Sequence, residues 1–374
     1  MTLTRRTVLA GLSLAPFAPR LALAAGGGER RLIVVILRGG LDGLALVPPI
    51  GDPDYRTARG ALAVTDTLAF DGQFALHPAL TTLAEARRDT LLVHATATPY
   101  RDRSHFDGQD VLEAGVADTG QIEDGWLARA LSHLPDTRAI GIGPSLPLLL
   151  RGSPQASNWS PSRLPSADAD LLARLATLYQ ADPLFAQSLE QARATDAVAG
   201  DMDMTAGARD GQAAADAAAR FLVAPDGPRL AVLDIGGWDT HANQSATLDR
   251  GLAALNQTLA SLKAGLAAVW DSTVIFGVTE FGRTVAANGT GGSDHGVGGA
   301  AFLIGGAVDG GRVITDWPGL SPSALYQGRD LVPTLNLNQV IAGVLHDHLR
   351  LSNRALTGHV LPGVQSPLSG LIRS

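Results

Sequence analysis

The stretch that decides the fold lies near the start of the chain and reads RLIVVILRGGLDG, residues 31–43. Residues 32–37 are all large aliphatic side chains, and most of them are β-branched. A strand that is apolar on both faces is typical of a parallel sheet covered by helices on both sides. The three glycines that follow predict a tight turn around Asp42.

The turn around Asp42 does not fit a dinucleotide-binding loop. Its glycine spacing differs from G-x-G-x-x-G, and Asp42 would lie where a phosphate has to approach. An aspartate at the carboxyl end of a first strand suits a metal ligand better. The alternative is a turn aspartate that bonds its own backbone.

Further apolar runs predict the rest of a sheet. Strands are expected at residues 90–95, 138–142, 229–235, 272–279 and 300–304, and helices at 76–88, 125–134, 248–269 and 337–349. This alternation predicts an α/β fold with a mostly parallel central sheet. The alanine-rich residues from about 160 to 224 are interpreted as an inserted helical cap. We expect one domain over residues 25–374.

Polar residues gather beyond the predicted strands. They are Asp42, then Ser104 and His105, then Asp239 and His241, then Glu280 and Arg283, and finally Asp294 and His295 before the last strand. In open α/β sheets, ligands bind beyond the carboxyl ends of the strands. We therefore expect all five groups to lie along one edge of the sheet.

The longest of these polar segments reads GVTEFGRTVAANGTGGSDHG, residues 277–296. A strand that ends in a carboxylate and a guanidinium, followed by a glycine-rich loop that ends in Asp-His, indicates a site for a metal or an anion. Asp239 and His241 offer the oxygen and nitrogen ligands that such metals accept. The alternative for His241 is a place beside a helix N-cap.

Ser104 and His105 follow the second predicted strand. Ser104, with Asp107 three residues on, resembles a capping box, which would explain both residues structurally. A hydroxyl at a helix N-terminus is also well placed to attack a phosphate. The capping interpretation leaves His105 unexplained.

Composition excludes several classes of function. The formal charge is −7 and the chain has a single lysine, Lys263, so a nucleic-acid partner is not expected. The chain has no cysteine, which excludes disulfides and thiolate metal ligands.

Residues 1–24 are interpreted as a twin-arginine signal peptide. Arg5 and Arg6 precede a moderately apolar stretch that ends in Ala-Leu-Ala. Pro16, Pro19 and Arg20 interrupt that stretch, so no stable membrane span is expected after signal removal. We expect a periplasmic or secreted protein.

The motifs RGGLDG, RSHFDGQD, GGWDTH, TEFGRT and SDHG, in that order behind a twin-arginine start, resemble the exported bacterial family of unknown function numbered 1501. That family is grouped with the alkaline phosphatase and sulfatase superfamily. The resemblance implies a three-layer αβα sandwich and, by analogy, metal-assisted hydrolysis of phosphate or sulfate esters. One departure is Phe281, which stands where the superfamily commonly has a histidine.

The resemblance leads to a working hypothesis about the site. A divalent metal (zinc, manganese, magnesium or calcium) would be held by Asp42, Asp239, His241, Glu280, Asp294 and His295. Ser104 would attack a small anionic ester, with His105 as the proton-transfer residue and Arg283 on the ester oxygens. The alternatives are a non-catalytic periplasmic metal- or anion-binding protein, and a scaffold whose site only stabilises the fold.

Overall fold

The structure, a computed structural model, describes residues 29–118, 123–161, 168–200 and 211–373. The predicted signal peptide lies outside the described residues. None of the helices within these ranges combines the length and apolarity needed to cross a membrane.

A nine-stranded sheet forms the centre of the molecule. Its strands are β1 (Arg31–Arg38), β4 (Thr90–Ala97), β5 (Ala139–Ile142), β6 (Ala156–Trp159), β7 (Leu230–Gly236), β8 (Thr273–Val278), β9 (Gly299–Ile304), β10 (Arg312–Ile314) and β11 (Leu335–Asn336). They follow the order β10-β4-β9-β8-β1-β7-β5-β6, and β11 also pairs with β4. All neighbours are parallel except β9, which is antiparallel to β4 and β8. The predicted α/β class with a mostly parallel sheet is confirmed. Strands β2 (Leu68–Ala69) and β3 (Ala75–Leu76) form a separate hairpin.

The strand β1 explains why helices cover both faces of the sheet. Successive side chains of a strand point to opposite faces. Ile33, Val35 and Leu37 belong to one buried hydrophobic cluster, whereas Leu32, Val34 and Ile36 belong to the other. Burial of both faces requires two helical layers.

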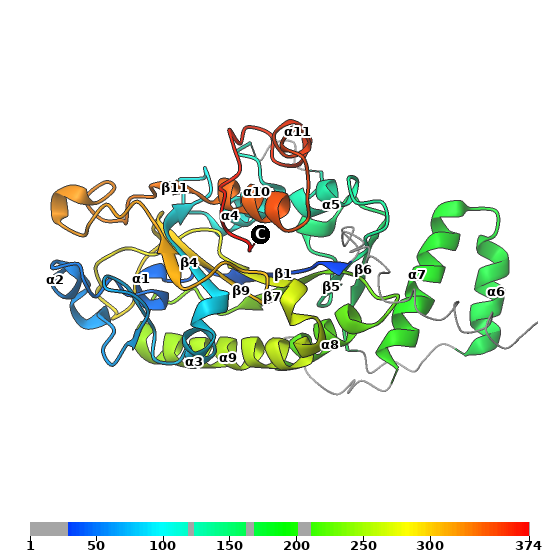
Figure 1. Ribbon diagram of the computed structural model, residues 1–374, viewed down its shortest axis with the longest axis horizontal. Helices are drawn as coiled ribbons and strands as arrows, with labels where there is room; N and C mark the ends of the chain where they lie inside the picture. The colour runs from blue at the N-terminus through cyan, green and yellow to red at the C-terminus, as the bar shows by residue number, and fades with distance from the viewer. Residues whose placement is uncertain (1–28, 119–122, 162–167, 201–210, 374) are drawn as a thin grey trace, which may run out of the picture.

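The two layers are visible on either side of the sheet in Figure 1. One contains α3 (Thr81–Glu85), α8 (Gly211–Val223) and α9 (Gln244–Gly265). The other contains α4 (His105–Ala114), α5 (Trp126–Leu131) and α10 (Leu337–Asp347). The expected three-layer sandwich is therefore present. Three further short helices are α1 (Gly43–Leu46), α2 (Tyr55–Arg59) and α11 (Asn353–Ala355).

The region predicted as a helical cap contains α6 (Ala169–Tyr179), α7 (Pro183–Ala199) and α8. Buried alanines of α8 pack in the same cluster as α9, so α8 is part of a sandwich layer. Figure 1 shows α6 and α7 projecting at the end of the molecule opposite to α1 and α2. The helices α1 and α2 follow the carboxyl end of β1, so α6 and α7 do not cover that edge of the sheet.

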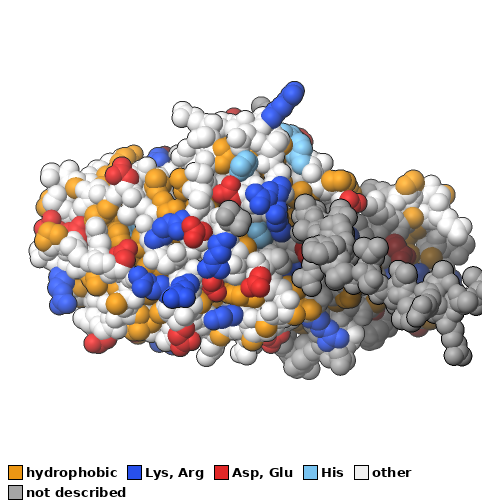
Figure 2. Space-filling model, in the orientation of Figure 1, with side chains coloured by type: hydrophobic (Ala, Val, Ile, Leu, Met, Phe, Trp, Pro, Cys, Tyr) orange, Lys and Arg blue, Asp and Glu red, His pale blue; other side chains and the backbone are white. Residues whose placement is uncertain are grey.

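On the face shown in Figure 2, Lys and Arg side chains are interspersed with Asp and Glu side chains.

Candidate metal centre

The antiparallel direction of β9 determines which loops meet at the carboxyl edge of the sheet. The chain leaves β7 and β8 at that edge, towards Asp239 and Glu280 respectively. Because β9 runs the opposite way, the residues before it, including Asp294 and His295, lie at the same edge. The first turn of α4 adds His105.

Three histidines converge on Asp239. The Oδ1 atom of Asp239 lies 3.0 Å from Nε2 of His241 and 3.2 Å from Nε2 of His295. Its Oδ2 atom lies 3.4 Å from Nε2 of His105. The Nε2 atoms of His241 and His295 are 2.9 Å apart. We call these four residues the His–Asp cluster.

The second ring nitrogen of each histidine has its own oxygen partner. The Nδ1 atoms of His105, His241 and His295 face Glu280 Oε1 at 2.8 Å, Asp294 Oδ1 at 3.3 Å and the Arg103 carbonyl at 2.9 Å, respectively. Each oxygen accepts a hydrogen bond, so we assign the proton of each neutral ring to Nδ1. Nε2 then carries the lone pair of each neutral ring, and each of the three Nε2 atoms lies beside a carboxylate oxygen of Asp239.

The His–Asp cluster fits a divalent metal ion. Nε2 of His105 is buried and, although it lies 3.4 Å from Asp239 Oδ2, makes no hydrogen bond among the described residues, so its lone pair is available to a cation. Donor atoms of His105, Asp239 and His295 lie within 4.8 Å of one another. Ligand atoms around tetrahedral zinc are roughly 3.3 Å apart, close to the spacings between Asp239, His241 and His295.

The residues behind the cluster complete a typical metal-site arrangement, in which an oxygen acceptor orients each histidine. Burial works against ionisation of Glu280, but hydrogen bonds from His105, Gln109 and the Gly39 amide outweigh it and lower its pKa. The hydrogen bond to Glu280 in turn raises the pKa of His105. The sequence analysis missed Gln109, although it lies four residues after His105 on the same helical face.

Arg283 favours the ionised form of Asp239. Burial alone would raise the pKa of Asp239, but the hydrogen bond and charge of Arg283 lower it overall. Burial also lowers the pKa of His295. Asp239 is therefore ionised and His295 neutral at neutral pH, the forms in which both residues bind metals.

Arg283 lies behind Asp239 with a fully buried side chain. Its Nη1 donates to Asp239 Oδ1 at 2.8 Å, while Nε and Nη2 donate to the hydroxyl and carbonyl of Ser293. All three nitrogens are thus occupied within the protein. The sequence analysis predicted that Arg283 would contact the oxygens of an ester substrate. In the structure its side chain contacts Asp239 and Ser293 instead.

Asp42 is not brought into the His–Asp cluster. Its Oδ1 accepts hydrogen bonds from the amides of Leu44 and Ala45, as the N-cap of α1. Its Oδ2 accepts from Arg59 and Gln244, and the residue is almost fully buried. Four fixed donors leave little carboxylate capacity for a metal, so the turn interpretation describes Asp42 better than the ligand prediction.

Glu280 and Asp294 were also predicted as ligands. In the structure they contact the Nδ1 atoms of His105 and His241, on the side of each ring away from Asp239. Ser104 occupies the N-cap of α4, but its side chain makes no capping bond. Its neighbours on both sides belong to the site, because the Arg103 carbonyl faces His295 and His105 is part of the cluster. Ser104 therefore lies at the border of the site, half-buried.

Comparison with solved structures finds matches of low similarity. The C-terminal periplasmic domain of EcEptC from Escherichia coli, in complex with Zn, is 10% identical with a TM-score of 0.39, covering 74% of this chain and 73% of that chain. The phosphonate monoester hydrolase of Agrobacterium radiobacter is 13% identical with a TM-score of 0.39, covering 86% and 74%. The alkaline phosphatase of the Antarctic bacterium TAB5 is 11% identical with a TM-score of 0.36, covering 73% and 91%.

At these TM-scores the similarity carries no argument about the reaction. None of the curated protein sequences compared with the chain matches it. A family model does match, over residues 29–364, and its description is "Protein of unknown function (DUF1501)". That match spans most of the chain, including the whole His–Asp cluster, and the chain therefore belongs to this family.

Proposed function

We propose that this chain is a metal-dependent hydrolase of phosphate or sulfate esters that acts outside the cytoplasm. The observation that carries the proposal is the convergence of three imidazole Nε2 atoms on Asp239, each ring held by an oxygen acceptor on its far side. Zinc fits this donor set, because nitrogen and carboxylate oxygen are its common ligands.

His105, Asp239, His241 and His295 would hold the metal. A divalent ion held there would polarise the ester and stabilise negative charge that develops during its cleavage. Glu280, Asp294 and the Arg103 carbonyl fix the rings, and Arg283 keeps Asp239 ionised and oriented.

Two further residues at the border of the cluster have roles in this proposal. Ser104 supplies the attacking hydroxyl, because its side chain is not used as a helix cap and it directly precedes His105. Arg329 takes over the anion-binding role first assigned to Arg283. Its side chain is 45% exposed, its Nε pairs with Asp330 at 3.0 Å and its Nη2 donates to the His295 carbonyl at 2.8 Å, so Nη1 is the nitrogen that would bind the anion.

A second candidate function is metal binding without turnover. Four protein ligands complete a tetrahedral zinc site, whereas catalytic zinc sites keep one position open. His241 decides between the two functions. Its side chain is 46% exposed, more than those of His105 and His295, which are 24% exposed, so His241 is the residue that could give way to a substrate.

The first experiment measures the metal content of protein purified without chelator, together with hydrolysis of 4-nitrophenyl phosphate, bis(4-nitrophenyl) phosphate and 4-nitrophenyl sulfate. We expect stoichiometric metal and turnover of at least one ester. His105→Ala should lose both. His133→Ala is the matched control, because His133 is an exposed histidine paired with His359 outside the cluster. Wild-type protein that stays metal-free after incubation with zinc would refute the proposal.

Two variants separate the enzyme from the binder. In an enzyme with three essential ligands, His241→Ala keeps its metal and Ser104→Ala keeps its metal but loses turnover. In a closed binding site, His241→Ala loses metal and wild-type protein hydrolyses none of the three esters. Full activity of Ser104→Ala would remove Ser104 as the nucleophile.

Export is tested separately by fractionating cells that express the full-length chain. Replacement of Arg5 and Arg6 by lysine should keep the protein in the cytoplasm.

A further inference from the structure

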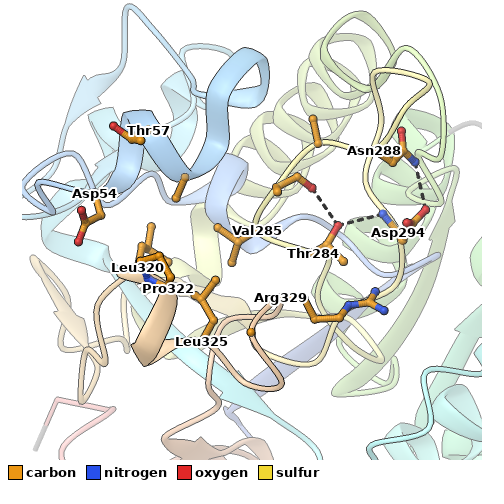
Figure 3. Close-up of a pocket in the computed structure, with 14 residues that line it drawn as sticks. Asp54, Thr57, Thr284, Val285, Asn288, Asp294, Leu320, Pro322, Leu325 and Arg329 are labelled. Carbon is orange, nitrogen blue, oxygen red and sulfur yellow. Dashed lines mark hydrogen bonds between the residues drawn. The ribbon is translucent and has the colours of Figure 1, made fainter.

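A cavity of about 450 Å³ opens between α2, the segment after β8 and the loop around residues 320–329. Figure 3 shows Val285, Leu320, Pro322 and Leu325 grouped along it, with Asn288, Asp294 and Arg329 together on another side. The volume lies within the range of roughly 300–1,000 Å³ that is usual for small-molecule sites.

The lining of this cavity is asymmetric. Apart from Asp54 and Thr57 of the α2 region, the part away from Asp294 is formed by aliphatic side chains and proline. Arg329 is the only cationic residue in the lining. A ligand that fills the cavity therefore meets apolar surface along most of its length, with Arg329 and Asp294 as the charged residues on one side and Asp54 on the other.

The polar side of the cavity borders the His–Asp cluster. Asp294 Oδ1 lies 3.3 Å from Nδ1 of His241. Nη2 of Arg329 donates to the His295 carbonyl. The side chain of Asn288 contacts both Asp294 Oδ1 and the His241 carbonyl. Residues of the cavity thus hold two of the three cluster histidines in place.

The cavity wall is anchored by a buried ion pair. Nη1 of Arg59, at the end of α2, donates to the carbonyls of Thr284 and Val285, and its Nη2 pairs with Asp42. Two opposite walls, α2 and the segment after β8, are therefore joined through one fully buried guanidinium. A wall held this way is preformed before a ligand arrives.

We propose that this cavity binds the uncharged, apolar substituent of the ester substrate, an aryl or alkyl group, while the anionic head lies at the His–Asp cluster. The inference rests on the proposed function and names its substrate class. A second anionic group at the far end is disfavoured, because Asp54 lies there and no cation faces it from the lining.

The binding test needs no turnover. Fluorescence titration with 2-naphthol, the neutral aryl part of a candidate ester, should show saturable binding to the wild-type protein. Ala286→Trp fills the cavity from an exposed alanine and should abolish that binding. Ala173→Trp, at an exposed alanine of α6 outside the lining, is the matched control and should bind as wild type does. Equal binding to all three proteins, or no binding to wild type, would overturn the inference.

The second arm compares 2-naphthyl phosphate with methyl phosphate as substrates, or the corresponding sulfates if the enzyme proves to be a sulfatase. The ratio of their kcat/KM values should fall at least about tenfold in Ala286→Trp and stay unchanged in Ala173→Trp. Leu325→Asp, a polar change without added bulk, should lower the ratio in the same direction.

The two arms distinguish the possible failures. Turnover of both esters with an unchanged ratio in Ala286→Trp would overturn the cavity assignment and leave the hydrolase standing. Cavity-dependent binding of 2-naphthol, with metal bound but no ester hydrolysed, would support the apolar site and refute the hydrolase.

Discussion

Two aspartates that follow neighbouring strands have opposite surroundings. Asp42 follows β1 and accepts hydrogen bonds only from donors that carry a permanent proton, namely two backbone amides, Arg59 and Gln244. Asp239 follows β7, and three of its four close partners are imidazoles, which can donate or accept. The first arrangement is complete without a ligand, whereas the second leaves nitrogen lone pairs that a cation can use. Whether an aspartate has a structural role or is suited to bind a metal therefore depends on its hydrogen-bond partners more than on the aspartate itself.

The largest effect is expected from removing the buried carboxylate. Asp42→Ala leaves the Arg59 guanidinium buried and unpaired, and should lower the free energy of unfolding by about 3–5 kcal/mol. Urea denaturation measures this change. Asp309→Ala is the control. The ion pair between Asp309 and Arg312 is exposed, so its loss should lower the free energy of unfolding by only about 0–1 kcal/mol. If Asp42→Ala instead lost metal with little change in stability, Asp42 would be the ligand that the sequence predicted.

The matching change at the second aspartate should act on metal affinity. Asp239→Asn keeps an oxygen for the Arg283 hydrogen bond but removes the anionic ligand. Zinc affinity, measured by competition with a chelator, should fall by more than about 100-fold, because loss of even an outer partner costs about 10–100-fold. The control is Asp234→Asn. Asp234 lies in the same strand and pairs with Arg38, so this variant should bind zinc as tightly as wild type. A variant that binds zinc as tightly as wild type would exclude Asp239 from the ligand set.

A smaller loss of metal affinity is expected at Glu280, which supports His105 from behind. Glu280→Gln keeps an acceptor for Nδ1 of His105 but loses the charge, and should weaken zinc binding by about 10–100-fold. Glu113→Gln is a matched control, because Glu113 is a second buried carboxylate that bonds Arg38 and the Leu149 amide. Complete loss of metal in Glu280→Gln would make Glu280 a direct ligand.

The smallest effect on stability is expected from His94, whose two ring nitrogens both make hydrogen bonds. Nδ1 of His94 accepts from the Ala95 amide and Nε2 donates to the Val47 carbonyl, and burial lowers its pKa to about 4. Between that value and its ordinary pKa of about 6.5, the unfolded chain binds a proton that the folded chain does not. The stabilisation from neutral His94 is complete above about pH 6.5 and is lost as the pH falls towards about 4.

This single side chain should lower the free energy of unfolding by about 0.7 kcal/mol between about pH 7 and pH 6. Urea denaturation at both pH values, in wild type and His94→Asn, measures the difference. An identical pH slope in the two proteins would show that His94 is not buried as a neutral ring.

The sequence predicted those strands whose own residues form a recognisable apolar run. Strands β1, β4, β7 and β8 each contain a buried apolar run, LIVVIL, LLV, LAVL and VIFGV respectively, because both faces of these segments are covered. The edge strand β6 has the sequence ASNW and is only partly buried, so it lacks that pattern. The helix expected over residues 76–88 shrinks to Thr81–Glu85, because β3 takes its first residue and Pro78 follows.

The location of the site was predictable from the positions of strand ends, but the roles of its residues were not. Residue type and strand position correctly grouped His105, Asp239, His241 and His295 at one edge of the sheet. Whether a carboxylate faces a guanidinium or an imidazole depends on residues far away in sequence. Arg59 approaches Asp42 from α2, and Arg283 approaches Asp239 from beyond β8. No local pattern contains that information.

The position of β1 has a consequence for the order in which the molecule can form. The first strand of the chain lies in the middle of the sheet, where Leu32 pairs with Leu230 on one side and Val274 on the other. Contacts between residues so distant in sequence form slowly, because a long loop must close before they stabilise anything. A nascent chain shorter than about residue 278 therefore exposes one edge of its most hydrophobic strand. Assembly of the sheet, and with it of the His–Asp cluster, has to wait until most of the polypeptide has left the ribosome.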